Sequence, residues 1–144
     1  MRKLLVFLLA AVSVFTAAAM LPATATAATT GLTVTARWAL LGDDPATVVL
    51  VGRYSCGPFA GGAPLYGTVD LNVDQVTNGV TAHAIGHLVP TACDGTAHWF
   101  AAELTTFTGA TFRRANATWT GSGYVQGQEG FQNVYVPPTR IRIS

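Results

Sequence analysis

The sequence contains little charge, and lysine is almost absent from it. Lys3 is the only lysine, and charged residues make up 10% of the chain. Proteins that bind nucleic acid need a basic stripe that displaces counterions from the phosphates. Beyond the N-terminus, Arg113-Arg114 is the only adjacent basic pair. The composition therefore argues against nucleic acid as a partner.

Cysteine is equally scarce, because Cys56 and Cys93 are the only two. In an exported chain, two cysteines most simply form one disulfide. We expect this bond to pin the two sheets of a small β-sandwich and to stabilise it by roughly 4 kcal/mol. The alternative is a pair of free thiols that act as metal ligands. A blue-copper site is disfavoured, because both methionines, Met1 and Met20, lie in the N-terminal segment.

A long apolar run occurs only at the N-terminus, over residues 4–19, directly after Arg2 and Lys3. Ala25-Thr26-Ala27 then provides a cleavage site of the small-x-small type. These features predict a secretory signal peptide over residues 1–27 and a mature domain over 28–144. Cleavage after Ala25 and a retained transmembrane helix are the alternatives. Removal of Arg2 and Lys3 lowers the formal charge from +1 to −1.

Helical periodicity is absent from the mature chain, and period-two alternation replaces it. Residues 47–56 are apolar on both faces, which is typical of a central strand. Pro137-Pro138 interrupts the last strand and predicts an edge position or a bulge. We place Trp38 on a core face and expect 121–130 to be a mobile glycine-rich loop. The predicted strands cover residues 32–40, 47–56, 66–76, 80–88, 96–105, 112–125 and 133–143.

Seven short strands with frequent turn signals predict an all-β fold, a single immunoglobulin-like β-sandwich. Several short motifs also resemble a group of small secreted actinobacterial proteins that is classed only as a domain of unknown function. The motifs are Gly52-x-Tyr54-x-Cys56, Val73-x-Gln75, Cys93-Asp94-Gly95-Thr96-x-His98 and Phe112-x-x-Ala115-x-Ala117. The resemblance implies secretion and this sandwich, and supplies no catalytic residues.

A more distant resemblance is to the secreted chromoproteins of the neocarzinostatin type. Those are sandwiches with two disulfides that hold an enediyne in a cleft, whereas this chain has cysteines for one disulfide. The resemblance implies an alternative function, the carriage of a small apolar ligand. An aromatic-lined cleft would support it.

The histidines and Asp94 offer a second alternative, a metal-binding protein or a hydrolase built on His83, His87, His98 and Asp94. On a strand, His83 and His87 would lie about 13 Å apart, which is too far for one metal ion. A hydrolase would also need a serine on a sharp elbow. Ser122, between Gly121 and Gly123, lacks that sequence frame. We therefore expect no metal, no cofactor and no catalytic residues.

Aromatic residues supply the candidate binding surface. Trp99 falls on the outer face of its predicted strand, where it is either exposed or covered by a loop. An exposed aromatic on a sandwich face could bind a sugar or a protein partner. The sequence thus predicts a secreted, non-enzymatic, monomeric binding module, free of the membrane after cleavage, with a macromolecular or small-molecule partner. It would bind through loops 57–65 and 121–132 or through a surface of Trp99, Tyr66, Tyr124 and Phe131.

Overall fold

The computed structural model describes residues 31–144, and these form an all-β domain. The predicted signal peptide over residues 1–27 lies outside the described part of the chain. One short 3-10 turn, η1 (Ala60–Gly62), interrupts the strands. No helix in residues 31–144 has the length and hydropathy to cross a membrane. The strands are β1 (Thr33–Leu41), β2 (Thr47–Ser55), β3 (Tyr66–Thr77), β4 (Val80–Leu88), β5 (Ala97–Thr106), β6 (Asn116–Gly127) and β7 (Gly130–Arg142).

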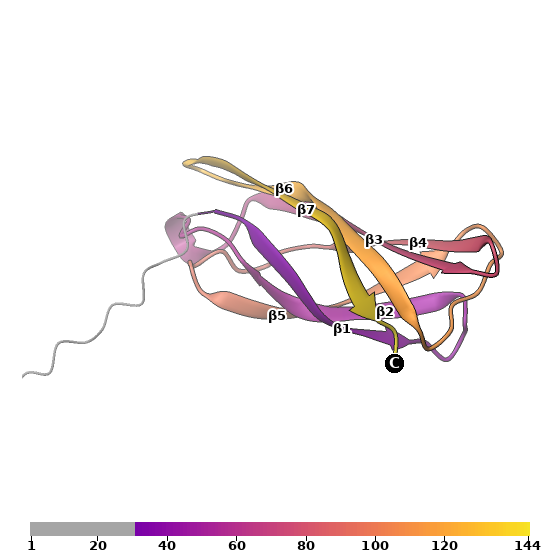
Figure 1. The fold of residues 1–144 in the computed structure, drawn as a ribbon. Coiled ribbons are helices and arrows are strands. Elements are labelled where there is room, and N and C mark those ends of the chain that lie inside the picture. Colours follow the sequence, from indigo (N-terminus) through magenta and orange to yellow (C-terminus); the bar gives the residue numbers. More distant parts are fainter. Residues whose placement is uncertain (1–30) are drawn as a thin grey trace, which may run out of the picture.

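The seven strands form one nearly closed antiparallel sheet in the order β1-β2-β5-β4-β3-β6-β7. β4 and β5 pair only where residues 84–85 meet residues 105–106. This short junction lets the sheet fold into two layers, one of β1, β2 and β5 and the other of β4, β3, β6 and β7 (Figure 1). Across the opening, Ala39 of β1 forms an isolated bridge with Ile143. The predicted all-β sandwich of about seven strands is confirmed.

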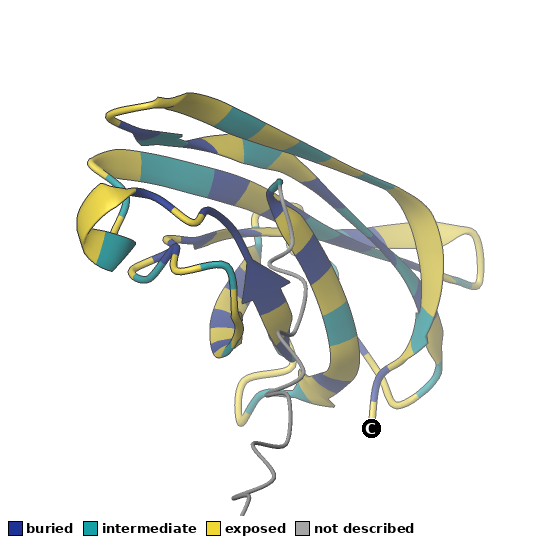
Figure 2. Ribbon diagram, turned by 90° about the vertical axis from the view of Figure 1, so that its left-hand side faces the viewer, coloured by how far each residue is buried: buried dark blue, intermediate teal, exposed yellow. Residues whose placement is uncertain are grey.

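Alternating side chains fill the space between the two layers. Along β3, Val69, Leu71 and Val73 are fully buried, as the alternation predicted. β2 lies between β1 and β5, which confirms that it is a central strand. Figure 2 shows the alternation as bands of buried and exposed residues along the strands. The core also includes Leu50, Leu104, Trp119, Val125 and Ile143.

The predicted Cys56–Cys93 disulfide is present, and both cysteines are fully buried. Its position differs from the expected link between two sheets. Cys56 directly follows β2, and Cys93 lies in the segment that crosses from β4 to β5. The bond therefore fastens this crossing segment to the end of β2. Backbone hydrogen bonds support it, because the amide of Cys93 donates to Gly62 and its carbonyl accepts from Phe59.

The prediction of a mobile loop over residues 121–130 was wrong, because β6 continues to Gly127 and a tight turn leads directly into β7. The glycines here serve close packing. A Cβ atom on Gly123 would lie 2.2 Å from the carbonyl oxygen of Thr68, and one on Gly127 would lie 2.5 Å from the Phe59 ring. Backbone and ring approach these positions so closely that only glycine fits.

β7 is the last strand in the sheet order, which confirms the edge position predicted from Pro137-Pro138. The pairing of β6 with β7 shifts register between Trp119 and Gly121, opposite these prolines. Because the bulge interrupts the β6–β7 ladder here, the two prolines do not have to donate the backbone hydrogen bonds that they cannot form.

Candidate functional site

Two half-exposed tryptophans stack on the outer face of β1, β2 and β5. Trp38 of β1 is 49% exposed and Trp99 of β5 is 50% exposed. Their ring centroids lie 5.7 Å apart, and their planes differ by 11°. They reach each other across the central strand β2, because Trp38 pairs with Val51 and Trp99 pairs with Arg53. Stacked aromatic rings that are exposed to solvent are typical of a surface that binds another molecule.

The prediction that Trp38 faces the core was wrong, and a β-bulge is the reason. The pairing of β1 with β2 shifts between Ala36 and Trp38, which leaves Arg37 as an extra residue. An extra residue reverses the facing of every side chain after it. Val34 is buried before the bulge and Ala39 is buried after it, so Trp38 turns to the outside.

Two arginines extend the tryptophan stack at both ends. The guanidinium carbon of Arg53 lies 4.6 Å from the Trp99 ring centroid. That of Arg37 lies 5.5 Å from the Trp38 ring centroid. Both distances are within the range of cation–π attraction. We call this row of Arg53, Trp99, Trp38 and Arg37 the Trp–Arg row.

Apolar side chains continue the surface beside the Trp–Arg row. Leu40 of β1 is exposed, and Val49 and Val51 of β2 are half-buried on the same outer face. Glu103 of β5, which pairs with Val49, is the one acidic residue of β5. The face thus combines an apolar strip with the two arginines of the Trp–Arg row and with Glu103 beside Val49.

The other predicted aromatic residues lie on the opposite layer. Tyr66 of β3 and Tyr124 of β6 contact edge to face, with ring centroids 6.1 Å apart. The Tyr66 hydroxyl donates to Oε1 of Gln126, and Phe131 pairs with Gln126 from the far side. Tyr135 of β7 lies nearby on the same face. The structure therefore joins three of the four predicted residues on one surface and places Trp99 on another.

His83 and His87 each contact an aspartate of the neighbouring strand. Nδ1 of His83 lies 2.5 Å from Oδ1 of Asp74, and Nδ1 of His87 lies 2.8 Å from Oδ1 of Asp70. The pairs are cross-strand neighbours on the outer face of β3 and β4, with Ile85 between the histidines. The ring of Phe107 also contacts the His83 ring edge to face. Each histidine thus has its own carboxylate partner.

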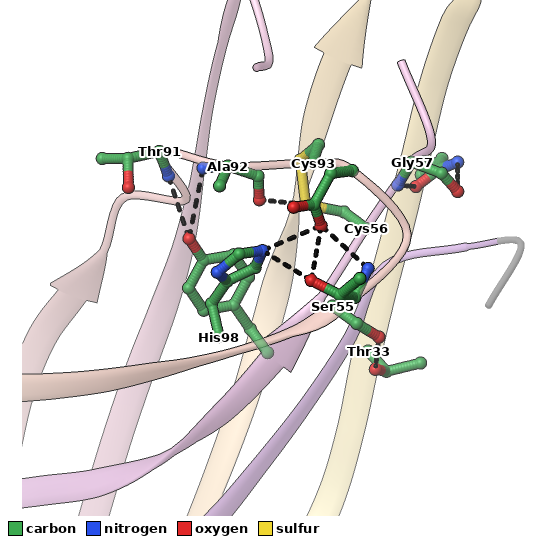
Figure 3. The surroundings of a disulfide bond; sticks show 12 residues. Thr33, Ser55, Cys56, Gly57, Thr91, Ala92, Cys93 and His98 are labelled. Atoms are coloured by element: carbon green, nitrogen blue, oxygen red, sulfur yellow. Dashed lines mark hydrogen bonds and ion pairs between the residues drawn. A yellow bond between two sulfur atoms is a disulfide. The ribbon is translucent and has the colours of Figure 1, made fainter. Parts of the chain in front are cut away.

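His98 lies near the disulfide, on a different part of the molecule (Figure 3), and Asp94 directly follows Cys93 in the chain. Nε2 of His98 is 2.9 Å from Oδ1 of Asp94. The same oxygen accepts hydrogen bonds from the backbone amide and the hydroxyl of Thr96. The hydrogen bond with His98, followed by those with Thr96, holds the pKa of Asp94 well below its usual range.

The structure does not bring the four residues of the metal or hydrolase hypothesis together. Residues 31–144 contain no cluster of three or more His, Cys, Asp or Glu side chains arranged to hold a metal ion. Ser122 pairs with Asp70, and His87 pairs with that aspartate from the opposite side.

Two shallow hollows lie on the surface of the described chain, and aromatic residues line neither of them. One is lined by residues of the β3–β4 turn and the β5–β6 loop, including Asn78, Ala110 and Arg113. The other lies over β3, β6 and β7, between Asp74 and Arg140. Neither is the aromatic cleft expected of a carrier for a small apolar ligand.

Comparisons of the chain with protein-family models, curated proteins and solved structures found no match.

The binding surface predicted from the sequence left out Trp38, Arg37, Arg53 and Tyr135. The sequence does carry a signal for the first two. Strict alternation from Val34 through Ala36 would place Trp38 inside and leave Ala39 outside. The adjacent Leu40-Leu41 disturbs that pattern, because alternation would place Leu41 outside, and such a disturbance is typical of a bulge.

Proposed function

We propose that this protein is a secreted binding module without catalytic activity, and that it binds a protein partner through the outer face of β1, β2 and β5. The observation that carries the proposal is the stacked pair of half-exposed tryptophans, Trp38 and Trp99. Tryptophan and arginine contribute most to the binding energy of protein interfaces. The Trp–Arg row combines both on a sheet face.

The surrounding side chains also favour a protein partner. Leu40, Val49 and Val51 extend the apolar strip, and Arg37 and Arg53 supply charge at its margin. Interfaces are commonly built this way, with an apolar centre and a polar rim. The shallow hollows lie elsewhere and lack aromatic walls, so they give no support to a small apolar ligand.

Secretion is part of the proposal. The Cys56–Cys93 disulfide supports it, because such bonds form and persist in oxidising compartments outside the cytosol.

The test is a capture experiment with the full chain, carrying a C-terminal tag, on the secreted and surface proteins of the producing cells. The variant Trp38→Ala/Trp99→Ala should bind the captured protein at least about tenfold more weakly, which is the usual loss at interface hot spots. Phe107→Ala is the matched control, because Phe107 is an exposed aromatic outside this face. Circular dichroism would verify that each variant is folded.

Equal affinity of the double variant and the wild type would refute the choice of surface. Capture of a glycan in place of a protein would overturn the partner class. Failure of the wild type to capture anything from either fraction would count against a binding module.

A further inference from the structure

The first half of β7 forms an open sheet edge with no charged residue. Residues 130–136 read Gly-Phe-Gln-Asn-Val-Tyr-Val. β7 ends the strand order, so no strand of the described chain pairs with its outer side here. Phe131 is 68% exposed and Tyr135 is 74% exposed. Figure 1 shows the β6–β7 hairpin at the margin of the molecule.

β1 and the second half of β7 each contain a feature that hinders pairing with the strands of other molecules. β1, at the opposite edge, is interrupted by the bulge at Arg37. The second half of β7 contains Pro137, Pro138 and the arginines Arg140 and Arg142. Residues 130–136, in contrast, contain no charge and no proline, and their pairing with β6 is regular.

The hydrogen-bonding direction along this edge follows from its neighbours. The carbonyl of Gln126 in β6 accepts a hydrogen bond from the amide of Leu65, so it points toward β3. In a strand, the N–H and C=O of one residue point to the same side, and successive residues alternate. Phe131 lies opposite Gln126. Because the backbone groups of Gln126 point away from β7, those of Phe131 point away from β6. The backbone groups of Phe131, Asn133 and Tyr135 face the open edge.

We propose that two copies of this protein pair edge to edge through β7, antiparallel and centred on Asn133. In this register Asn133 lies opposite its own copy, and Phe131 lies opposite Tyr135 of the second copy. The residues whose backbone groups face the edge then meet one another, so every one of those groups gains a partner. A two-fold axis generates the arrangement and closes it at two copies.

A second copy fits this edge better than an unrelated strand, because the segment is complementary to itself. Cross-strand aromatic pairs stabilise antiparallel strands, and like charges opposite each other destabilise them. The register provides the Phe131–Tyr135 pair twice. The arginines of β7 lie beyond the prolines and outside the paired segment. The dimer would replace the monomer expected from the sequence.

The pairing would also join the two sheets into one continuous sheet. The two-fold axis stands perpendicular to it, so the outer faces of both copies remain on the same side. The aromatic surface of Tyr66, Tyr124, Phe131 and Tyr135 would then continue from one copy to the other. This surface is separate from the Trp–Arg row, so the inference does not depend on the proposed function.

Asn133 lies at the centre of the proposed interface, so charged substitutions at this position test the pairing. Asn133 is exposed, and its backbone groups point away from β6, so a charged side chain there leaves the domain intact. Asn133→Lys places two positive charges opposite each other, and Asn133→Asp places two negative charges there. Each variant alone should be a monomer, and an equal mixture of the two should form a heterodimer. Gln128→Lys, in the exposed β6–β7 turn, is the matched control.

Sedimentation equilibrium and native mass spectrometry of the secreted protein across the micromolar range provide the measurement. We expect the wild type and Gln128→Lys to dimerise with increasing concentration, with at least a tenfold weaker association for either Asn133 variant alone. A wild type that stays monomeric at all concentrations would overturn the proposal. So would a dimer that persists in Asn133→Lys, or a mixture of the two variants that fails to associate.

Discussion

At the scale of single residues, the facing of Trp38 determines the candidate binding surface. The strand was predicted over residues 32–40, and its existence is confirmed by β1. The side of the strand on which Trp38 lies was predicted wrongly, because one extra residue at Arg37 reverses the facing. Trp38, which was predicted to face the core, thus forms half of the exposed pair with Trp99.

Asp94 lies in surroundings that favour its ionised form. Its carboxylate accepts hydrogen bonds from Thr96 and contacts His98, and these lower its pKa. The unfolded chain therefore binds a proton at this site more readily than the folded chain does. The resulting stabilisation is fully present above the ordinary Asp pKa of about 3.9, and it is lost as pH falls from there toward the lowered pKa.

We predict that Asp94→Asn unfolds at a lower temperature than the wild type near pH 7. The difference should shrink as the pH falls below about 4, because the wild-type carboxylate then becomes protonated. Thermal unfolding followed by circular dichroism between pH 7 and pH 2 checks this. Asp43→Asn is a suitable control, since it changes the charge equally in an exposed turn. A difference that stays constant over the whole pH range would contradict the prediction.

At the scale of elements, the disulfide joins two segments that hydrogen bonds already hold together. Cys56 directly follows β2, and Cys93 lies in the crossing from β4 to β5. The carbonyl of Cys56 also accepts a hydrogen bond from the amide of Gly95. Since β4 and β5 pair over only a short junction, this crossing depends on the disulfide and its neighbours for its position.

We predict that Cys56→Ser lowers the free energy of unfolding by about 2–5 kcal/mol, because it restores the freedom of a closed loop to the unfolded chain. Urea unfolding of the wild type and the variant, with and without reductant, measures the difference. The reduced wild type should approach the variant, and reductant should leave the variant unchanged. Equal midpoints for the oxidised wild type and the variant would show that the bond adds no stability.

Sequence patterns predicted the strands of this protein but not the role of its glycines. Period-two alternation located all seven strands, and the paired prolines located the edge strand. The segment 121–130 was assigned to a loop because it is rich in glycine, which usually marks turns. Gly123 and Gly127 instead face positions where backbone or a ring leaves no room for a Cβ atom. The atoms that exclude a Cβ there belong to strands and loops far away in the sequence, so the sequence pattern could not show why glycine is needed.

At the scale of the whole molecule, the two sheet layers present different aromatic surfaces. The Trp–Arg row lies on the layer of β1, β2 and β5, and the tyrosine-rich surface lies on the layer of β3, β4, β6 and β7. We propose a protein partner for the first surface. The second lies beside the open edge of β7, where we propose a second copy.

We predict that the protein recovered from the culture medium begins at Ala28 and has the mass of residues 28–144 less two hydrogens. The two-hydrogen deficit reports the disulfide, and the missing N-terminal residues report cleavage after Ala27. Mass spectrometry under denaturing and native conditions measures both. An intact N-terminus in the cell fraction would contradict secretion. Additional mass under native conditions would revive the carrier or metal hypothesis.

The sequence by itself determined the strand pattern, the disulfide partners and the edge position of the last strand. These properties follow from local alternation, from the presence of only two cysteines and from the missing N–H of proline. The tertiary structure alone decided which aromatic residues meet. Trp38 and Trp99 are far apart in the chain and touch only because β1 and β5 flank β2 and a bulge turns Trp38 outward. Such contacts depend on register, and one residue of slip reverses them.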